Sequence, residues 1–547
     1  MNDFSRRQFI QQTTGAMLPF ILLPGITAAW PGFTSDYQVA DTKYGKLRGC
    51  RQNGVTIFKG IPYAGNASGK NRFKKATPVK PWTGVRDALQ LGNPSVQDPS
   101  QTYGLNEPEP DENCLFLNIW TPANDNKKRS VMVYNHGGGF QTGSGGSVTA
   151  DGSNLARMYD VVVVETNHRL GLLGFLYLDE VAGEAYRGSG NRGVQDIAVA
   201  LKWVNENIEQ FGGDPQNVMI FGESGGGMKT SCLYAMPEAA PYFNKASIES
   251  GPAVEIIEAE DAAQTTIELL NYFNIAPKNW KKLLEIPAGK LLEASYQLPR
   301  KPSEHSGGFY GIGNSGVGSF GAVKDGVVLP NHPFDPTAPD FSKDKPLLTG
   351  WNEDEYIFFA MVGGDKDVFT LSEEGLKNRL EKDFGNDAEL IRKTYHEAYP
   401  EKTPGEIYIA IRSIMMMGLG SVTIAERKAE QGGAPAYLYN FGYKSNMKIP
   451  GTEYEAGSMH ALDIPFKFYN VEGGMAGTKE DRFEASRNFT SLWTSFARHG
   501  KPVAENQPEW PAFNLQDRAL MRIDAPCSVI TDRYKTIREM WKSIQKP

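Results

Sequence analysis

Short apolar runs alternate with helical patterns through the first half of the chain. The runs Val131–Tyr134 and Val161–Val164 are bounded by turn residues, which is typical of buried strands in a mostly parallel sheet. Between Gly193 and Gln210 apolar residues recur at helical spacing, and the apolar run Val218–Phe221 follows soon afterwards. This alternation predicts an α/β fold with a large, mostly parallel central sheet flanked by helices.

The second half keeps the strands but loses this regular alternation. Lys345–Thr349 and Ala436–Phe441 predict further central strands, whereas residues 253–331 are first helical and then rich in Gly and Ser. We interpret that stretch as helical and loop insertions over the mouth of an active site. Amphipathic helices around Phe489 and Tyr534 complete the chain. No linker poor in apolar residues divides it, so a single catalytic domain over residues 30–547 is expected.

Composition narrows the possible partners. The chain has 547 residues, a net charge of −7 and 40% hydrophobic residues, which suits a globular protein with a large core. Nucleic acid is not expected as a partner, because no basic face or dense basic stretch is present.

The N-terminus has the features of an export signal. Arg6 and Arg7 precede a modest apolar run from Thr13 to Pro24, and small residues follow up to Ala29. This predicts a twin-arginine signal peptide over residues 1–29 and a periplasmic or secreted enzyme. A membrane anchor is the alternative, but the run is shorter than the ~20 residues that span a bilayer. No other segment is expected to cross a membrane, so no stable membrane insertion is predicted.

The sequence Gly222-Glu223-Ser224-Gly225-Gly226 directly follows the apolar run ending at Phe221. A sharp turn from strand to helix would lift a serine hydroxyl clear of the backbone, and side chains two residues away on either side would collide there. The motif therefore predicts a nucleophilic Ser224.

A nucleophilic serine needs a base, and in this fold class the base follows both the serine and the acid along the chain. His460 is the candidate left after the other histidines are set aside by order or by local context; these are His136, His168, His305, His332, His396 and His499. The acid is expected just past the strand at Lys345–Thr349. Position alone leaves Glu353, Asp354 and Glu355 open.

Donors for an oxyanion are expected at His136-Gly137-Gly138-Gly139-Phe140, which follows the run Val131–Tyr134. A glycine triplet behind a histidine, with a serine elbow downstream, indicates the type of oxyanion hole found in lipases and esterases.

The motifs together resemble those of the type B carboxylesterase family, which includes cholinesterases and bacterial p-nitrobenzyl esterases, on the α/β-hydrolase fold. The resemblance runs from about Tyr37 to the C-terminus. It rests on GIPYA at 60–64, ENCLFLNIW at 112–120, HGGGF at 136–140, NHRLG at 167–171, WVNENIEQFGGDP at 203–215, FGESGGG at 221–227 and the segment around His460 that ends in DIPF.

The resemblance implies roles for individual residues. It selects Glu355 as the acid, Gly138, Gly139 and Gly225 as oxyanion donors, and Ser250 as a supporting serine. It further implies that two charged residues, Glu112 and Arg169, support the fold.

This chain also departs from the family pattern. The family usually has Ala where Gly225 stands, so we expect Gly225→Ala to be tolerated. Tyr356 stands where Gly is common. The family's first disulfide would join Cys114 to a cysteine at the place of Val96, so that bridge is absent; Cys50, Cys114, Cys232 and Cys527 are expected to be free, mostly buried thiols.

These features predict hydrolysis of a small-molecule carboxylic ester through a covalent acyl-enzyme, with no metal or organic cofactor. One alternative is the same triad acting on amide, lactone or carbonate-like bonds; another is a non-catalytic binding member of the family. The pocket walls are expected from residues 97–110, 306–321 and 351–362, which carry no readable substrate code.

Overall fold

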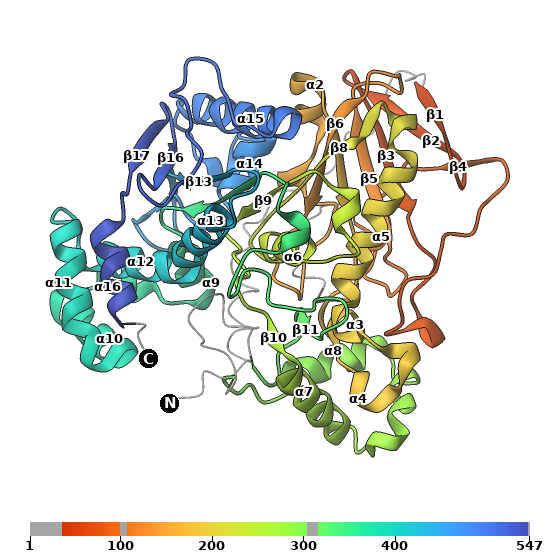
Figure 1. The fold of residues 1–547 in the computed structure, drawn as a ribbon, viewed down its shortest axis with the longest axis horizontal. Coiled ribbons are helices and arrows are strands. Elements are labelled where there is room, and N and C mark those ends of the chain that lie inside the picture. The colour runs from red at the N-terminus through yellow and green to blue at the C-terminus, as the bar shows by residue number, and fades with distance from the viewer. Residues whose placement is uncertain (1–35, 99–106, 304–315, 545–547) are drawn as a thin grey trace, which may run out of the picture.

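A computed structural model describes residues 36–98, 107–303 and 316–544 (Figure 1). The predicted signal peptide, residues 1–29, lies outside these residues. The described chain forms a 13-stranded sheet of order β1-β2-β3-β5-β7-β6-β8-β9-β12-β13-β16-β17, with β4 paired to β2. Its strands are β1 Tyr37–Thr42, β2 Gly45–Gln52, β3 Val55–Pro62, β4 Val85–Asp87, β5 Phe116–Thr121, β6 Arg129–Asn135, β7 Val162–Thr166, β8 Gly213–Glu223, β9 Lys245–Glu249, β12 Leu347–Asn352, β13 Ala436–Phe441, β16 Ala519–Ile523 and β17 Ser528–Thr531.

The predicted α/β fold is confirmed. From β7 to β16, neighbours in the sheet run parallel. The pairings of β1, β2, β3, β5 and β7 at one edge, and of β16 with β17 at the other, are antiparallel. Parallel strands buried on both faces need apolar residues at every position, which explains the continuous apolar runs.

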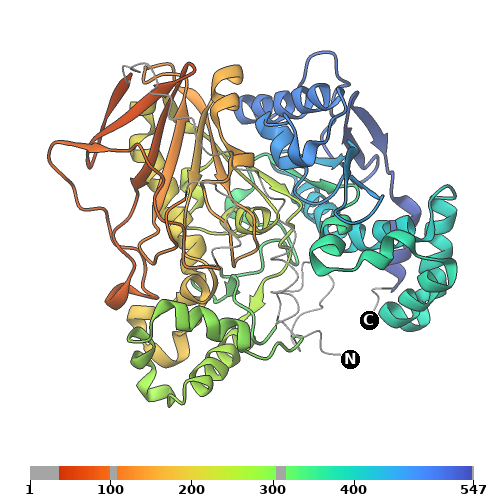
Figure 2. The same cartoon turned by 180° about the vertical axis from the view of Figure 1, so that it is seen from behind.

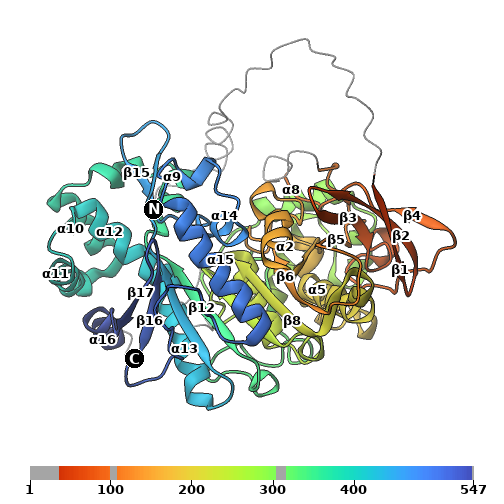
Figure 3. The ribbon, with the colours of Figure 1, turned by 90° about the horizontal axis from the view of Figure 1, so that it is seen from above.

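Two hydrophobic cores cover the two faces of the sheet. In β6, Val131 and Val133 belong to one core, and Met132 and Tyr134 belong to the other. Helices α5 and α6 supply the first core, and α2 and α15, both labelled in Figure 3, supply the second. The helices are α2 Ser153–Tyr159, α3 Gly171–Phe175, α4 Asp179–Ala182, α5 Arg192–Asn207, α6 Gly225–Tyr234, α7 Ala259–Tyr272, α8 Ala288–Gln297, α9 Tyr356–Gly363, α10 Glu373–Phe384, α11 Ala388–Ala398, α12 Pro404–Ser413, α13 Leu419–Gln431, α14 Asp463–Phe468, α15 Arg482–His499 and α16 Lys535–Ile544.

Additional helices gather at the two ends of the sheet. Helices α10, α11 and α16 lie together at the end nearer β17, and β1, β2 and β4 form the opposite end (Figures 1 and 2). The predicted insertion 253–331 is helical at first, with α7 and α8, as expected. Its Gly/Ser-rich part falls largely on residues 304–315, outside the described residues.

One helical stretch contradicts the expectation that no segment beyond the N-terminus could span a membrane. Residues Pro404–Gln431, which join α12, a π-helical turn at Ile414–Gly418 and α13, have the length and mean hydropathy of a membrane span. In the fold, α13 packs on β12 and β13, and 61% of the most apolar window is buried. Its apolar composition therefore serves the core of this fold.

Candidate active site

Ser224 lies between the end of β8 and the start of α6. Its φ of 58° and ψ of −125° are a strained conformation for a residue with a side chain, and its N–H donates to Glu249 O at 2.9 Å. A Cβ on Gly222 would lie 2.6 Å from backbone atoms of Gly226, and one on Gly226 would lie 1.9 Å from Asn135 O. The predicted need for small residues on both sides of the serine is confirmed.

The structure brings Ser224, His460 and Glu355 together in one row. His460 Nε2 lies 2.8 Å from Ser224 Oγ, and His460 Nδ1 lies 2.5 Å from Glu355 Oε2. Glu355 follows β12, and His460 lies in the loop between β13 and α14. Because β8 and β12 both pair in parallel with β9, their carboxyl ends meet at one edge of the sheet. Glu355 and His460 follow Ser224 by 131 and 236 positions along the chain, and the fold brings both to the serine at this edge.

The three carboxylates that position alone left open now separate. Glu355 is fully buried, and its Oε1 accepts a hydrogen bond from Asn352 N at 2.7 Å, which leaves Oε2 for His460. Asp354 accepts from Ser458 N, and Glu353 pairs with Arg533 at 2.7 Å. The carboxylates of Asp354 and Glu353 therefore bind groups other than His460.

The histidines set aside by sequence have other partners. His332 Nε2 lies 3.0 Å from Glu258, His396 lies 3.3 Å from Glu373, and His499 ends α15. His136 and His168 stack with ring centroids 4.6 Å apart. His305 lies outside the described residues.

The predicted oxyanion donors lie beside the serine. Gly138 and Gly139 have φ values of 82° and 61°, a left-handed conformation that favours glycine, and they follow β6, the neighbour of β8. Within the part of the chain that the structure describes, the N–H groups of Gly138, Gly139 and Gly225 donate no hydrogen bond. The three donors are therefore free to bind an oxyanion.

The structure argues against the expectation that Gly225→Ala is tolerated. A Cβ on Gly225 would lie 2.1 Å from Gly139 O and 2.2 Å from Gly139 N. Both atoms are backbone, so the loop would have to move. Glycine at this position allows the two donor segments to lie in direct contact.

A second carboxylate faces His460. Glu223 Oε1 lies 3.3 Å from His460 Nδ1 and accepts from Ala461 N at 3.1 Å. Burial raises the pKa of Glu223, and the charge of the neighbouring His460 opposes that rise. Burial opposes a charged His460, but the carboxylates of Glu223 and Glu355 outweigh it and raise the pKa of the imidazole. The site therefore favours the imidazolium form that arises during acyl transfer.

A buried ion cluster lies behind the elbow. Lys467 pairs with Glu249 and, at 2.8 Å, with Asp463, and all three side chains are at most 1% exposed. Glu249 also accepts from Trp493 Nε1 at 2.6 Å. Since Glu249 O holds Ser224 N, this cluster fixes the strand end beside the nucleophile.

Ser250 is placed next to the elbow, but its supporting role stays a prediction. Its N–H donates to Gly350 O at 2.9 Å, and its φ is 45°. Its buried hydroxyl has no hydrogen-bond partner among the described residues. The following residue, Gly251, would place a Cβ 2.0 Å from Ser224 O, so this segment packs closely on the nucleophile turn.

The charged residues interpreted as fold-supporting form buried or largely buried ion pairs away from the triad. Arg169 binds Asp196 at 2.7 Å, and Glu112 binds Arg72 at 2.6 Å. The four cysteines are free, and all except Cys50 are buried, as expected.

Two aromatic rings border the base. Phe358 and Phe359 of α9 lie with ring centroids 5.6 and 4.8 Å from the His460 ring, and both are partly exposed. Among the described residues, no group of three or more His, Cys, Asp or Glu side chains could hold a metal ion.

Sequence reasoning assigned no role to several residues of this site. For Glu223, the available signal was its position directly before Ser224 in the serine motif. Lys467 and Glu249 are 218 residues apart, and no sequence pattern joins them.

Comparisons with known proteins agree with this geometry. A model of the carboxylesterase family matches residues 36–541. A para-nitrobenzyl esterase of Bacillus subtilis (strain 168) is 35% identical over 91% of this chain and 96% of its own length. A phenmedipham hydrolase of Pseudarthrobacter oxydans is 29% identical over 88% of this chain and 94% of its own length. The crystal structure of a Geobacillus stearothermophilus carboxylesterase at pH 6.2 superposes with a TM-score of 0.78 at 35% identity, covering 92% of this chain and 99% of that one.

Proposed function

Because this chain belongs to the carboxylesterase family and is a carboxylic ester hydrolase, we propose that Ser224 is its nucleophile, His460 its general base and Glu355 the acid that orients His460. The observation that carries this proposal is the continuous row from Ser224 Oγ through His460 to Glu355, with contacts of 2.8 and 2.5 Å. The row has the order and geometry of a serine hydrolase triad.

The reaction follows from these contacts. Ser224 Oγ attacks the ester carbon while its proton passes to His460 Nε2, and the carbonyl electron pair moves onto the oxygen. The N–H groups of Gly138, Gly139 and Gly225 bind that oxyanion, each donor contributing on the order of 3 kcal/mol in such sites. His460 then gives its proton to the leaving alcohol, and the acyl-enzyme is hydrolysed by water that His460 activates.

We propose that the substrate is an uncharged ester with an apolar group. Phe358 and Phe359 border His460, which favours apolar contact near the reacting carbon. Glu223 and Glu355 lie at His460 Nδ1 and disfavour a nearby anion. Esters carrying a carboxylate close to the carbonyl are therefore expected to react slowly.

Rapid-quench mass spectrometry with p-nitrophenyl esters tests the assignment. We expect a burst of p-nitrophenol and a mass increase of one acyl group on the Ser224 peptide, and neither in S224A. An acyl group on another residue would contradict the proposal.

A panel of neutral and anionic esters tests the substrate class. Anilides measure activity on bonds other than esters. Phenmedipham, the compound in the name of one relative, is tested beside them.

We propose that residues 1–29 direct export by the twin-arginine route. The paired Arg6 and Arg7, the modest apolar run and the small residues before Ala29 support this. We expect periplasmic enzyme with its N-terminus near residue 30, and loss of export in the double variant R6K/R7K. Export unchanged in that variant would contradict the proposal.

A further inference from the structure

Lys229 is a buried cation that the reaction as described does not use. It lies on α6, five residues after Ser224, with an exposed fraction of 0%. Its Nζ donates to His136 O at 2.9 Å. Among the described residues no carboxylate forms an ion pair with it or raises its pKa. Burying an unpaired ammonium is costly, so its retention here calls for a physical reason.

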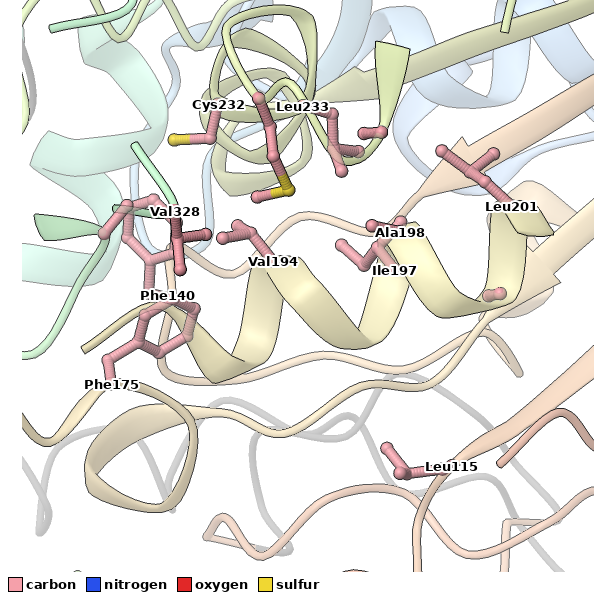
Figure 4. Close-up of a cluster of buried hydrophobic side chains, with 14 of the residues drawn as sticks. Leu115, Phe140, Phe175, Val194, Ile197, Ala198, Leu201, Cys232, Leu233 and Val328 are labelled. Carbon is pink, nitrogen blue, oxygen red and sulfur yellow. The ribbon is translucent and has the colours of Figure 1, made fainter. Parts of the chain in front are cut away.

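The hydrogen bond of Lys229 holds the beginning of the oxyanion loop. His136 O belongs to the peptide that enters Gly137, and Gly138 and Gly139 follow directly. The far end of the loop is held by uncharged contacts. Phe140 packs on Phe175 with ring centroids 4.9 Å apart (Figure 4), and its carbonyl accepts from Gly171 N at 2.7 Å. Lys229 thus supplies a charged anchor at the end where the loop leaves β6.

The groups facing Lys229 do not cancel its charge. They are His136, after β6, and His168, after β7, whose rings stack on each other. Burial, and then the charge of Lys229, lowers the pKa of both imidazoles well below their ordinary value, so both are neutral. Burial also lowers the pKa of Lys229 itself to about 7. The ammonium is therefore the charge at the base of this loop, and it is lost within the neutral pH range.

We propose that Lys229 is a positioning residue for the oxyanion loop, and that its positive charge favours the tetrahedral intermediate over the bound ester. This inference rests on the proposed acyl-enzyme reaction. When Ser224 attacks, negative charge gathers on the carbonyl oxygen beside Gly138 and Gly139, while Lys229 keeps its proton throughout. A fixed, buried cation acts on that charge more strongly than on the neutral ester.

Substitution of Lys229 by Met tests the proposal. K229M keeps the length of the side chain and removes both the charge and the hydrogen bond. We expect kcat to fall about tenfold or more, with KM nearly unchanged, because the interaction is made in the transition state. We further expect the kcat of wild-type enzyme to fall as Lys229 loses its proton, and K229M to lack this alkaline limb.

Lys245 offers a matched control. It is likewise buried, and it donates to a backbone carbonyl, Ala497 O, at 2.8 Å, but it begins β9 at the end of the sheet away from Ser224. K245M should keep the wild-type kcat and the alkaline limb. Labelling of Ser224 by an organophosphate in each folded variant separates this inference from the proposed function. If Ser224 is labelled in K229M and the kcat and alkaline limb are those of wild type, the role of Lys229 is refuted while the nucleophile stands.

A measurement on wild-type enzyme keeps the test independent of variant folding. A trifluoromethyl ketone forms a tetrahedral adduct with an oxyanion, whereas the matching methyl ketone binds largely as the neutral carbonyl. We expect affinity for the trifluoromethyl ketone to fall as pH rises from about 7 to 9, and that for the methyl ketone to stay constant. Equal pH dependence of the two would overturn the proposal.

Discussion

At the scale of single residues, the base lies between two carboxylates. His460 Nδ1 faces Glu355 at 2.5 Å and Glu223 at 3.3 Å, and both raise its pKa. E223Q removes one of these charges. The amide oxygen of the new side chain can still accept the hydrogen bond from Ala461 N. The pKa of His460 should therefore fall, and the acid limb of kcat/KM should move to lower pH by about one unit. A pH–rate profile checks this; an unchanged or raised acid limb would contradict it.

The contact between Gly225 and Gly139 gives a second prediction. G225A forces the Gly139 backbone to move, because the new Cβ would lie 2.1 Å from its oxygen. Displacing an oxyanion donor should lower kcat on the order of 10²-fold, with the fold retained. Gly289 of α8 has nothing within 4 Å of such a Cβ, so G289A is the control and should keep full activity. A wild-type kcat in G225A would contradict this prediction, because it would mean that the loop can move without displacing the oxyanion donors.

Sequence reasoning reached some of these residues and not others. Ser224 and His460 follow from motif and order, since a strained turn needs glycines and a triad on this fold has a fixed order. Glu355 was chosen over Glu353 and Asp354 by resemblance alone, because the choice depends on which oxygens Arg533 and Ser458 N already engage. Lys229 gave no signal, since its partner is a backbone carbonyl from another strand end.

At the scale of elements, the segment that carries the acid is fixed by ion pairs. Glu353 pairs with Arg533, Lys444 and Arg522, which reach it from the C-terminal third of the chain. Burial opposes its charge, but these cations outweigh it and lower the pKa of Glu353 to about 2. The charged network thus holds the turn between β12 and α9 in which Glu355 lies.

This network predicts a pH-dependent stability. Because the pKa of Glu353 is lower in the folded state than its unfolded value of about 4.3, the stabilisation is present above that pH and is lost as pH falls towards 2. E353Q should lower the free energy of unfolding by about 2–3 kcal/mol at pH 7. Urea unfolding of both proteins at pH 7, 5 and 3.5 should show this difference shrinking below pH 4.3. A difference constant over that range would contradict the assignment.

The long apolar helix shows where element prediction by composition fails. Residues Pro404–Gln431 pass the test for a membrane span, yet the stretch is the covering layer of β12 and β13. A helix that packs against a sheet on one side and other helices on another needs apolar residues on most faces.

At the scale of the whole molecule, the strands at the centre of the sheet were predictable and its edges were not. Strands β6, β7, β8 and β13 are buried on both faces, so their apolar runs stand out in the sequence. Edge strands such as β1 alternate exposed and buried residues over short lengths, a weaker signal. The helix α16 was predicted from its amphipathic pattern, but its packing on α11 joins distant segments and was not.

The sheet holds the molecule together without disulfides, which gives a prediction for the whole chain. All four cysteines are free, and burial raises the pKa of Cys114 and Cys232 to about 12, so these thiols react slowly while the protein is folded. Alkylation of denatured protein should modify four thiols with or without prior reductant, and Tm should not depend on reductant. Fewer modified thiols without reductant would contradict this.

The account depends most on Ser224 as the nucleophile. Diethyl p-nitrophenyl phosphate transfers its phosphoryl group to an activated serine, so labelled enzyme can be digested and its peptides mapped by mass spectrometry. We predict one diethylphosphoryl group per chain, on Ser224, appearing in step with loss of esterase activity and absent in S224A. Stoichiometric inactivation with the label on any other residue would contradict the account.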